Sequence, residues 1–563
     1  MDVRTLEGDV EDAYSSYSSC SDDEHHTLLD PLAEKDTGSR LERGHSFSSQ
    51  RKGLHHPSLV HRCTNLSAAI WHALKSSSSF HVSPLPRSSR LRSRTRRACR
   101  ILPWALLAIL TLSTFAWLVP VFSLPSFVTP PQHYHDLRLL AQASTQPGRG
   151  NPSQEKVFIA AILHDPTGEL LSGPYAQNIL DLVDLLGPQN TFLSIFESDS
   201  GEVGRIALES FRAKVACEHE IVAVPAQPLD DIQVFSLPNG DRVVRRIEYL
   251  AKARNRALEP LNRPGAVRYD RILYLNDVIF DPVEAVQLLF STNVQEDGRA
   301  EYDAACAMDF KNPFIYYDTF ATKDFDGYAP GLPMYPWFSG EGSGLSRRDV
   351  LKGTDHVRVK SCWGGMVAFD ASFFQQQSNN DNNDTIDGPN HDNENIDQIV
   401  HFRNAFELGW EYSECCLIYA DKAAISIPAI YLNPFIRVAY STTTFTWLPL
   451  LRRLERIFLP LQVMINHFAH LPTYNERRDV APDDLVMKRV WAGGNATTTT
   501  SDDSNDNDAF LDPANCAWKE EKMGNGGFCG IQATFVLKLE HGAGKDVWVK
   551  LPDDPLRGGD GRT

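Results

Sequence analysis

The chain has 563 residues, a length that fits one large domain or two domains of modest size. Its formal net charge is −17 at pH 7, and an acidic balance of this size argues against a nucleic-acid partner. The composition changes along the chain, so each segment is best considered separately.

Residues 1–100 lack the composition of a folded core. They are rich in Ser, Arg and His, they contain short acidic clusters, and they hold few apolar runs. Segments of this kind cannot bury enough apolar surface to offset the loss of chain entropy. We therefore expect a disordered tail.

Residues 101–122 form an apolar segment without a charged residue, long enough as a helix to cross a bilayer. Trp104 and Trp117 lie near its ends, and seven Arg precede it within residues 87–100. A buried core helix is the alternative, but core helices are seldom apolar on every side. We predict a single-pass anchor with a cytosolic tail. The next segment, 123–155, is predicted to be a luminal stem, since Pro, Gln, Gly and Ser are frequent there.

Cysteine usage agrees with a luminal placement. Seven of the ten Cys follow residue 122, where a lumen would permit disulfides, and no CxxC pair indicates a structural zinc site. Cys516 and Cys529 flank a short Gly-rich loop and are a candidate local pair. Asn383 and Asn495 each begin an Asn-x-Thr sequence and are predicted glycosylation sites.

From residue 157 the chain alternates short apolar runs with helical patterns, which is typical of a wound α/β sheet. Residues 377–397 are dominated by Asn and Asp and are predicted to be a solvated insertion; a calcium loop is a poorer interpretation because Asn383 takes the place of the leading Asp. Residues 446–563 are predicted to be a partly disordered C-terminal extension with a small hairpin. The predicted strands are 157–163, 191–196, 221–224, 272–275 and 302–308, the predicted helices are 175–186, 206–215 and 242–259, and the hairpin comprises 534–538 and 547–550.

The ten residues RILYLNDVIF, at 271–280, have the pattern of a buried strand that ends in Asn276 and Asp277. A carboxylate at the end of such a strand suits a divalent cation that holds a sugar diphosphate across the edge of the sheet. Taken alone, the pattern also fits an ordinary turn, because Asn and Asp end many strands. Asp277 is our candidate metal ligand for Mn²⁺ or Mg²⁺, with Asn276 beside it in the nucleotide-sugar site.

Three residues of the preceding helix are candidates for binding the nucleotide sugar. Arg246 and Arg254 are eight residues apart, so they lie on neighbouring faces, and one of them could clamp a diphosphate. Asn255 stands next to the second arginine. A solvated basic face is the alternative interpretation.

Two further motifs carry candidate site residues. Trp363, Gly364 and Gly365 combine a ring for a sugar face with backbone that a ligand can approach closely, although such a turn also serves packing. Glu414 and Asp421 are the candidate catalytic acids, and a surface acid is the alternative for the first.

The aromatic stretch 310–338 is a candidate acceptor wall, with Tyr317, Asp318 and Trp337 as its predicted acceptor-binding residues. Rings there would stack on sugar faces. The alternative is that they cover an edge of the sheet.

Several ordered blocks between residues 157 and 440 together resemble one family, the fungal cryptococcal mannosyltransferases (glycosyltransferase family sixty-nine), which also includes capsule-associated proteins of encapsulated yeasts. The resemblance is specific because the blocks occur in order over this span. The blocks are 246–261, 272–280, 302–310, 317–324, 361–371, 413–421 and 433–440.

The resemblance implies a GT-A-like catalytic domain over residues 156–445 of a type II Golgi membrane protein. It further implies transfer of mannose from GDP-mannose to a mannoside or polysaccharide in α-1,3 linkage, with retention and a divalent cation. Asp277 matches the metal carboxylate of the family, and Glu414 matches the acid that faces the acceptor. The sequence departs from a full DxD motif because Asn276 replaces one acid.

Two other functions stay open at this stage. One is a non-catalytic factor in polysaccharide assembly or export, since the family includes members named for the capsule. The other is a transferase that uses a different nucleotide sugar, because nothing in the sequence identifies the base.

Overall fold

The computed structural model describes residues 103–115, 126–198, 200–224, 234–236, 242–375, 399–491, 509–510, 516–538 and 548–550, with residues 119, 123 and 232. Residues from Trp117 onward belong to one compact unit, and residues 103–115 belong to another. The predicted glycosylation sites, Asn383 and Asn495, and the insertion 377–397 lie outside the described residues.

The predicted membrane anchor at 101–122 is wrong. Across the described ranges, no helix is both long and apolar enough to cross a membrane. The placement as a single-pass Golgi membrane protein with a luminal domain falls with the anchor.

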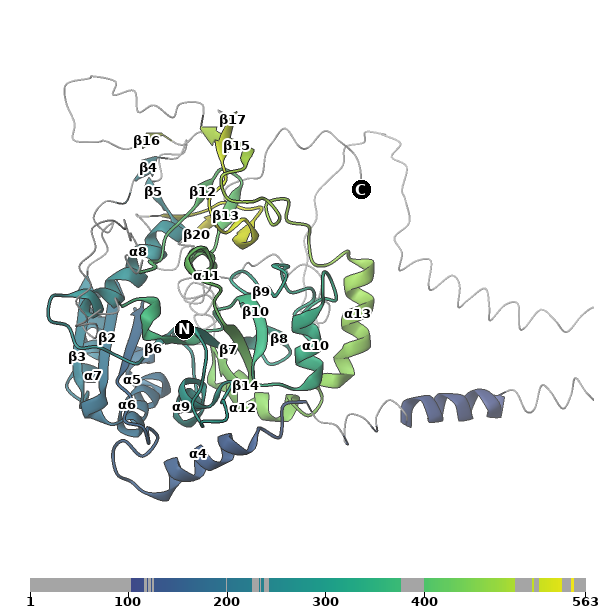
Figure 1. The fold of residues 1–563 in the computed structure, drawn as a ribbon, viewed down its shortest axis with the longest axis horizontal. Coiled ribbons are helices and arrows are strands. Elements are labelled where there is room, and N and C mark those ends of the chain that lie inside the picture. Colours follow the sequence, from purple (N-terminus) through teal and green to yellow (C-terminus); the bar gives the residue numbers. More distant parts are fainter. Residues whose placement is uncertain are drawn as a thin grey trace, which may run out of the picture. The chain divides into compact units, whose positions relative to one another are not determined.

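A ten-stranded mixed sheet forms the centre of the larger unit, which confirms the predicted α/β class (Figure 1). Its first four strands in spatial order, β3-β2-β1-β6, are parallel. Strand β11 is antiparallel to both β6 and β7, and β14 is parallel to β7. The strands in spatial order are β3 (Glu218–Val224), β2 (Thr191–Ser198), β1 (Val157–Leu163), β6 (Arg271–Leu275), β11 (Met366–Asp370), β7 (Ala304–Asn312), β14 (Ile430–Ala439), β10 (Val357–Ser361) and β9 (Lys323–Asp324), with β8 (Ile315–Tyr316) paired to β7.

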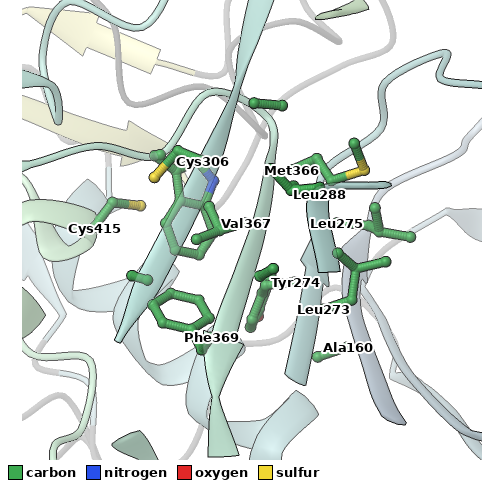
Figure 2. Packing of buried hydrophobic residues seen from close by; sticks show 14 of the residues in the cluster. Ala160, Leu273, Tyr274, Leu275, Leu288, Cys306, Met366, Val367, Phe369 and Cys415 are labelled. Carbon is green, nitrogen blue, oxygen red and sulfur yellow. The ribbon is translucent and has the colours of Figure 1, made fainter. Parts of the chain in front are cut away.

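Apolar side chains fill both faces of this sheet. Figure 2 shows Leu273 and Leu275 of β6 beside Leu288 on one side, while Tyr274 and Phe369 lie on the other. This alternation follows from the two-residue period of a strand. Because both faces are covered, the strands read as continuous apolar runs, as β1 does.

Five main helices flank the sheet. Helix α6 packs against α9, while α8 packs over β1 and β2 and contacts α11. Gly187 at the end of α6 has a positive φ of 91°, which suits a helix end. The helices are α6 (Pro174–Leu186), α7 (Gly201–Arg212), α8 (Arg246–Leu258), α9 (Pro282–Ser291) and α11 (Glu414–Ile425).

One predicted helix begins later than expected. We predicted a helix over 242–259, but Arg242–Arg245 form strand β5, and α8 begins at Arg246. Strand β5 pairs with β19 (Phe535–Lys538), a partner almost three hundred residues away in the chain. Tertiary pairing therefore overrides the local helical pattern at these four residues.

Residues beyond 445 supply strands to sheets that also contain earlier residues. The predicted C-terminal hairpin is confirmed as β19 paired with β20 (Trp548–Lys550). Strand β18 (Gly530–Ile531) pairs with β13 (Trp410–Tyr412). The predicted division at residue 445 therefore does not separate two packing units.

Part of the predicted stem is folded onto the domain. Helix α4 (Gln132–Ala143) contacts α9, and its Tyr134 is almost fully buried. The Tyr134 hydroxyl donates to Asp355 at 3.2 Å and accepts from Asn433 at 2.6 Å. These contacts fix the chain entering β1.

The smaller helices lie around the far strands of the sheet. Helix α10 packs against β10, and α12 packs against β14 and β7. Helix α13 follows α12 along the chain. Their bounds are α10 (Leu345–Lys352), α12 (Thr442–Leu451) and α13 (Phe458–Phe468).

Two disulfides link distant parts of the chain. Cys306 of β7 bonds to Cys362, which follows β10, and Cys416 of α11 bonds to Cys529. The predicted Cys516–Cys529 pair is therefore wrong. Proximity in sequence pointed to Cys516 as the partner of Cys529, but the actual partner lies 113 residues away.

We predict that the double variant Cys416→Ala with Cys529→Ala loses about 2–5 kcal/mol of stability, because the bond restricts a long loop in the unfolded chain. Urea denaturation measures this loss. Cys217→Ala is the matched control, since Cys217 is buried and forms no disulfide, and it should cost about 1 kcal/mol. A non-reduced peptide map that links Cys529 to Cys516 would contradict the assignment.

Candidate active site

Polar side chains from three parallel strands meet at one edge of the sheet. Strands β6, β7 and β14 share a direction, so their carboxyl ends lie at the same edge. Asp277 follows β6, Asp309 lies near the end of β7, and Tyr440 follows β14. The antiparallel β11 starts at this edge, which places the preceding turn, Gly364–Gly365, beside them.

The order of the strands reverses beside Asp277. The chain moves from β1 outward through β2 to β3, and then returns to form β6 on the other side of β1. Ligands of open α/β sheets bind outside the carboxyl ends of the strands at such a reversal. Asp277 lies next to this reversal, where the sequence predicted a diphosphate.

Asn276 and Asp277 are held in place by the turn. The Asn276 amide N–H donates to the Gly365 carbonyl at 2.9 Å, and its Oδ1 accepts from Trp363 Nε1 at 3.0 Å. Asp277 is 7% exposed. Burial raises the pKa of the Tyr175 hydroxyl, and the charge of Asp277 raises it further. The charge of Asp277 therefore influences the ionisation of a neighbouring hydroxyl group, that of Tyr175.

The Gly364–Gly365 turn leaves no room for side chains. Both residues have a positive φ, 58° and 70°. A Cβ at position 364 would lie 1.9 Å from the Ala307 carbonyl oxygen, and one at position 365 would lie 2.9 Å from Val278. These glycines are therefore needed for close packing of the backbone as well as for its conformation.

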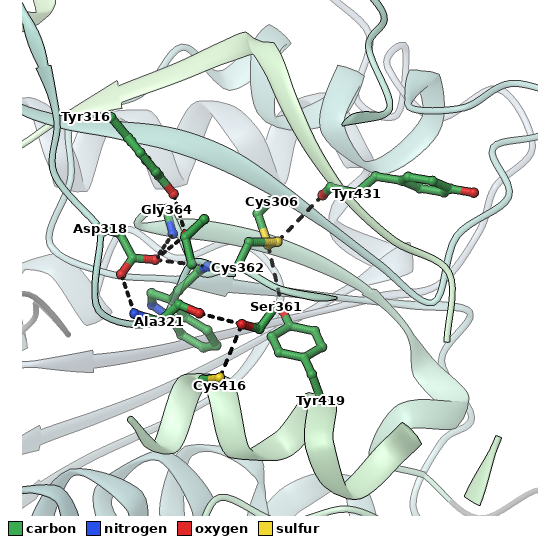
Figure 3. The surroundings of a disulfide bond; sticks show 12 residues. Cys306, Tyr316, Asp318, Ala321, Ser361, Cys362, Gly364, Cys416, Tyr419 and Tyr431 are labelled. Carbon is green, nitrogen blue, oxygen red and sulfur yellow. Dashed lines mark hydrogen bonds between the residues drawn. A yellow bond between two sulfur atoms is a disulfide. The ribbon is translucent and has the colours of Figure 1, made fainter. Parts of the chain in front are cut away.

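The buried side chain of Asp318 anchors the same turn. Its Oδ2 accepts from the amides of Trp363 and Gly364, each at 3.1 Å, as Figure 3 shows for Gly364. The disulfide from Cys306 to Cys362 fixes the preceding residue. Asp318, predicted to bind an acceptor, instead bonds the protein backbone.

Asp309 lies against Asp318 in the protein interior. Its Oδ1 accepts from the Asp318 amide at 3.0 Å, and its Oδ2 accepts from the Tyr440 hydroxyl at 2.9 Å. Asp309 is 1% exposed. Burial, followed by the charge of Asp318, raises the pKa of Asp309 to about 8.

Arg254 and Glu414 form a fully buried ion pair. Arg254 Nε donates to Glu414 Oε1 at 3.0 Å, and both side chains are 0% exposed. The guanidinium lies 4.4 Å from the centre of the Trp363 ring and also faces Tyr274 and Phe402. The sequence analysis assigned Arg254 to the nucleotide sugar and Glu414 to catalysis. In the structure the two side chains instead bind each other beneath the Trp363 ring.

The structure places two other predicted residues away from the edge. Arg246 stacks on the Phe535 ring of the C-terminal sheet at 5.6 Å. The Asn255 side chain forms two hydrogen bonds with the backbone of Phe402, at 2.7 and 3.0 Å. Since Arg246 and Arg254 are buried, a solvated basic face is also excluded for them.

Asp421 lies seven residues beyond Glu414, about 10 Å along helix α11. It forms a two-pronged ion pair with Arg403 at 2.7 and 2.8 Å. The two predicted catalytic acids are thus not brought together.

The predicted acceptor wall divides into buried and exposed parts. Trp337 is 1% exposed and packs against Phe127, Tyr335 and the guanidinium of Arg437. Tyr317, in contrast, is partly exposed, and its ring meets that of Tyr440.

Asp309 and Tyr440 are edge residues that the sequence analysis did not select as site residues. Each stands where an apolar strand ends, which is the same signal that identified Asp277. Reading every strand end as a possible part of one edge would have found them. What the sequence could not show is that β7 and β14 are neighbours in the sheet.

The donor groups around Asp277 suit a divalent cation that is shared with a substrate. Among the residues that the structure describes, no group of three or more His, Cys, Asp or Glu side chains is arranged to hold a metal. Mg²⁺ commonly binds through one or two carboxylates and the phosphates of a substrate rather than in a cage of protein ligands. A single buried carboxylate at the sheet edge fits that mode.

The fold and the edge together define an α/β domain with an acidic site at the reversal of its sheet. Residues 156–421 match the family model described as cryptococcal mannosyltransferase 1. This match supports the assignment of the chain to that family, which is a family of glycosyltransferases. No curated protein sequence matches the chain.

Two solved structures show distant similarity. Glucosyl-3-phosphoglycerate synthase from Mycobacterium tuberculosis, in complex with Mg²⁺ and UDP, is 11% identical, covering 64% of this chain and 89% of that chain with a TM-score of 0.25. The mannosyltransferase PcManGT from Pyrobaculum calidifontis, in complex with GDP-Man and Mn²⁺, is 10% identical, covering 61% and 79% with a TM-score of 0.26. Similarity at this level does not identify a substrate for this chain.

We predict that Gly364→Ala costs about 3 kcal/mol or more, because it combines an unfavourable φ with a clash against backbone. The control is Gly353→Ala. Gly353 has a φ of 77° but no atom within 4 Å of its would-be Cβ, so only the conformational cost of about 1–2 kcal/mol applies. Urea denaturation of both variants measures the difference, and equal losses would contradict the clash.

A pH dependence follows from the raised pKa of Asp309. The folded state keeps this proton up to about pH 8, whereas an unfolded aspartate loses it near pH ~4. The folded state therefore binds more protons in that window, and this stabilising contribution disappears as the pH rises through it.

We expect Asp309→Asn to remove this dependence. Urea denaturation between pH 5 and 8 should show wild type losing stability relative to the variant, by at most about 1.4 kcal/mol per pH unit. Parallel stability curves for the two proteins would show that Asp309 is ionised in the fold.

Proposed function

We propose that this protein transfers mannose from GDP-mannose to a mannoside or polysaccharide acceptor in α-1,3 linkage, with retention of configuration. The observation that carries the proposal is the buried carboxylate of Asp277, at the end of β6 and beside the reversal of the sheet, within the family match. The family supports mannose as the sugar. The GDP donor and the linkage rest on the resemblance of the sequence blocks, and so does a GT-A-like fold.

In this proposal the donor lies across the edge of the sheet, with its diphosphate at Asp277. A divalent cation there would neutralise the charge that develops on the leaving diphosphate. Asn276 does not serve as a second ligand in this arrangement, because its Oδ1 accepts from Trp363 and orients the strand end. The rigid turn and Asp318 keep Asp277 in position before any ligand binds.

The acid–base chemistry does not require Glu414 to act as a general base. Glu414 accepts a hydrogen bond from Arg254 at 3.0 Å in the interior. With retention, an oxygen of the leaving phosphate can take the proton from the acceptor hydroxyl as the new glycosidic bond forms. We therefore assign Glu414 a positioning role, in which it holds Arg254 beneath the ring of Trp363.

We predict that Asp277→Asn lowers kcat/KM about 100-fold or more, since the charge that supports the leaving group is lost. The assay measures GDP release by the full-length protein from GDP-mannose with Mn²⁺ and an α-linked mannobiose. EDTA should abolish turnover, and added Mn²⁺ or Mg²⁺ should restore it.

Asp370→Asn is the matched control. Asp370 also ends a strand, but β11 runs in the opposite direction, so Asp370 lies at the other edge of the sheet. Its turnover should equal that of wild type. Full activity of Asp277→Asn would refute the assigned site. Turnover of a different nucleotide sugar would correct the donor. If no donor is turned over, the non-catalytic assembly factor is favoured.

A further inference from the structure

The end of β14 lies against the segment that follows Asp277. The Ile279 amide donates to the Ala439 carbonyl at 2.7 Å, and the Ala439 amide donates to the Ile279 carbonyl at 3.0 Å. This two-way pairing aligns Tyr440, the next residue, with the strand end that carries Asp277. Burial and the charges of Asp309 and Asp277 all raise the pKa of the Tyr440 hydroxyl.

Tyr440 and Tyr317 form an aromatic pair that reaches the surface. Their ring centres are 5.1 Å apart in an edge-to-face arrangement, and both residues are partly exposed. Lys311 Nζ lies 5.7 Å from the centre of the Tyr317 ring. Partly exposed rings beside a carboxylate are suited to a sugar, whose C–H face packs on a ring while its hydroxyls stay solvated.

The other aromatic residues near the edge are not suited to this contact. Trp363 and Trp337 are each 1% exposed, and their rings face the guanidinium groups of Arg254 and Arg437. A sugar would have to displace these buried contacts to reach either ring. The tyrosine pair needs no such rearrangement.

The place of the pair in the sheet indicates which sugar it meets. The reversal of strand order lies between β1 and β6, whereas Tyr440 and Tyr317 lie at the β7–β14 side, beyond β11. At the edge itself, the segment that follows β6 bridges to the end of β14, so the tyrosine pair lies beside Asp277 on the side away from β1. A nucleoside at the β1 side therefore leaves the β14 side for the acceptor.

Asp309 holds Tyr440 from the interior. Its Oδ2 accepts from the Tyr440 hydroxyl at 2.9 Å, while its Oδ1 is fixed by the amide of Asp318. The Asp309 carboxyl group therefore cannot turn away without losing a second hydrogen bond. This arrangement orients the Tyr440 ring before a ligand arrives.

We propose that Tyr440, together with Tyr317, binds the acceptor sugar, and that Asp309 is a positioning residue that acts through the Tyr440 hydroxyl. This inference rests on the proposed function, because it requires a sugar acceptor at this edge.

The test titrates mannobiose at saturating GDP-mannose with the full-length protein. Tyr440→Ala should raise the acceptor KM about 10-fold by removing the ring, while the KM for GDP-mannose stays within about twofold of wild type. Tyr440→Phe and Asp309→Ala should each raise the acceptor KM about threefold, because each removes the hydrogen bond between the Tyr440 hydroxyl and Asp309. Combining them should add nothing further, because both remove the same hydrogen bond.

Tyr316→Phe is the matched control. Tyr316 lies in the neighbouring strand β8 and is fully buried, and its hydroxyl is hydrogen-bonded to that of Thr322 at 2.6 Å. The variant should leave the acceptor KM unchanged. A merely structural role for Tyr440 predicts instead that both KM values, or only the melting temperature, shift; this result would overturn the inference, as would an unchanged acceptor KM in Tyr440→Ala.

Direct binding separates this inference from the proposed function. Saturation-transfer NMR with mannobiose needs no turnover, so weaker binding by Tyr440→Ala supports the acceptor site even when the donor is not GDP-mannose. If wild type turns over GDP-mannose and Tyr440→Ala keeps its acceptor KM, only the inference fails. If wild type neither turns over nor binds mannobiose, both fail. If Tyr440→Ala does not fold, the Tyr440→Phe and Asp309→Ala pair decides.

Discussion

The ion pair between Arg254 and Glu414 is the interaction on which the candidate site depends. Both side chains are fully buried, so each has lost its water, and removal of one partner alone from such a pair typically costs about 3–5 kcal/mol. In other proteins, replacement of both partners by well-packed apolar residues is often neutral or even stabilising. The ion pair therefore contributes position as well as stability, because a planar guanidinium stacks on Trp363 in a fixed orientation.

A short chain of contacts connects this ion pair to the edge of the sheet and fixes the residues there. The Trp363 ring lies on Arg254, and its indole N–H donates to Asn276, the neighbour of Asp277. Asp318 binds the backbone of the same turn from the other side. Two disulfides lie next to these elements, since Cys362 precedes Trp363 and Cys416 follows Glu414 by two residues. The candidate site thus rests on a support that is rigid before any ligand binds.

The sequence predicted what depends on local pattern. The apolar run ending in Asp277 identified β6 and its acid, and the alternation of strands and helices identified the α/β class. What it missed depends on contacts between distant residues. Arg254 and Glu414 are 160 residues apart in sequence, and both were chosen, but nothing local indicates that they neutralise each other. The same limit explains β5, whose strand partner comes from the C-terminal sheet, and Cys529, whose partner lies in α11.

A site with a single carboxylate has a thermodynamic consequence for a divalent cation. Asn276 is oriented by Trp363, and the structure describes no cage of three or more acidic, His or Cys side chains. Asp277 alone would hold a cation weakly, and the phosphates of the donor would have to supply further ligands. Binding of cation and donor would then be coupled, and by linkage each would raise the affinity of the other by the same factor. Such a site would fill only when both are present, so the edge would gain its positive charge only when there is a diphosphate for it to act on.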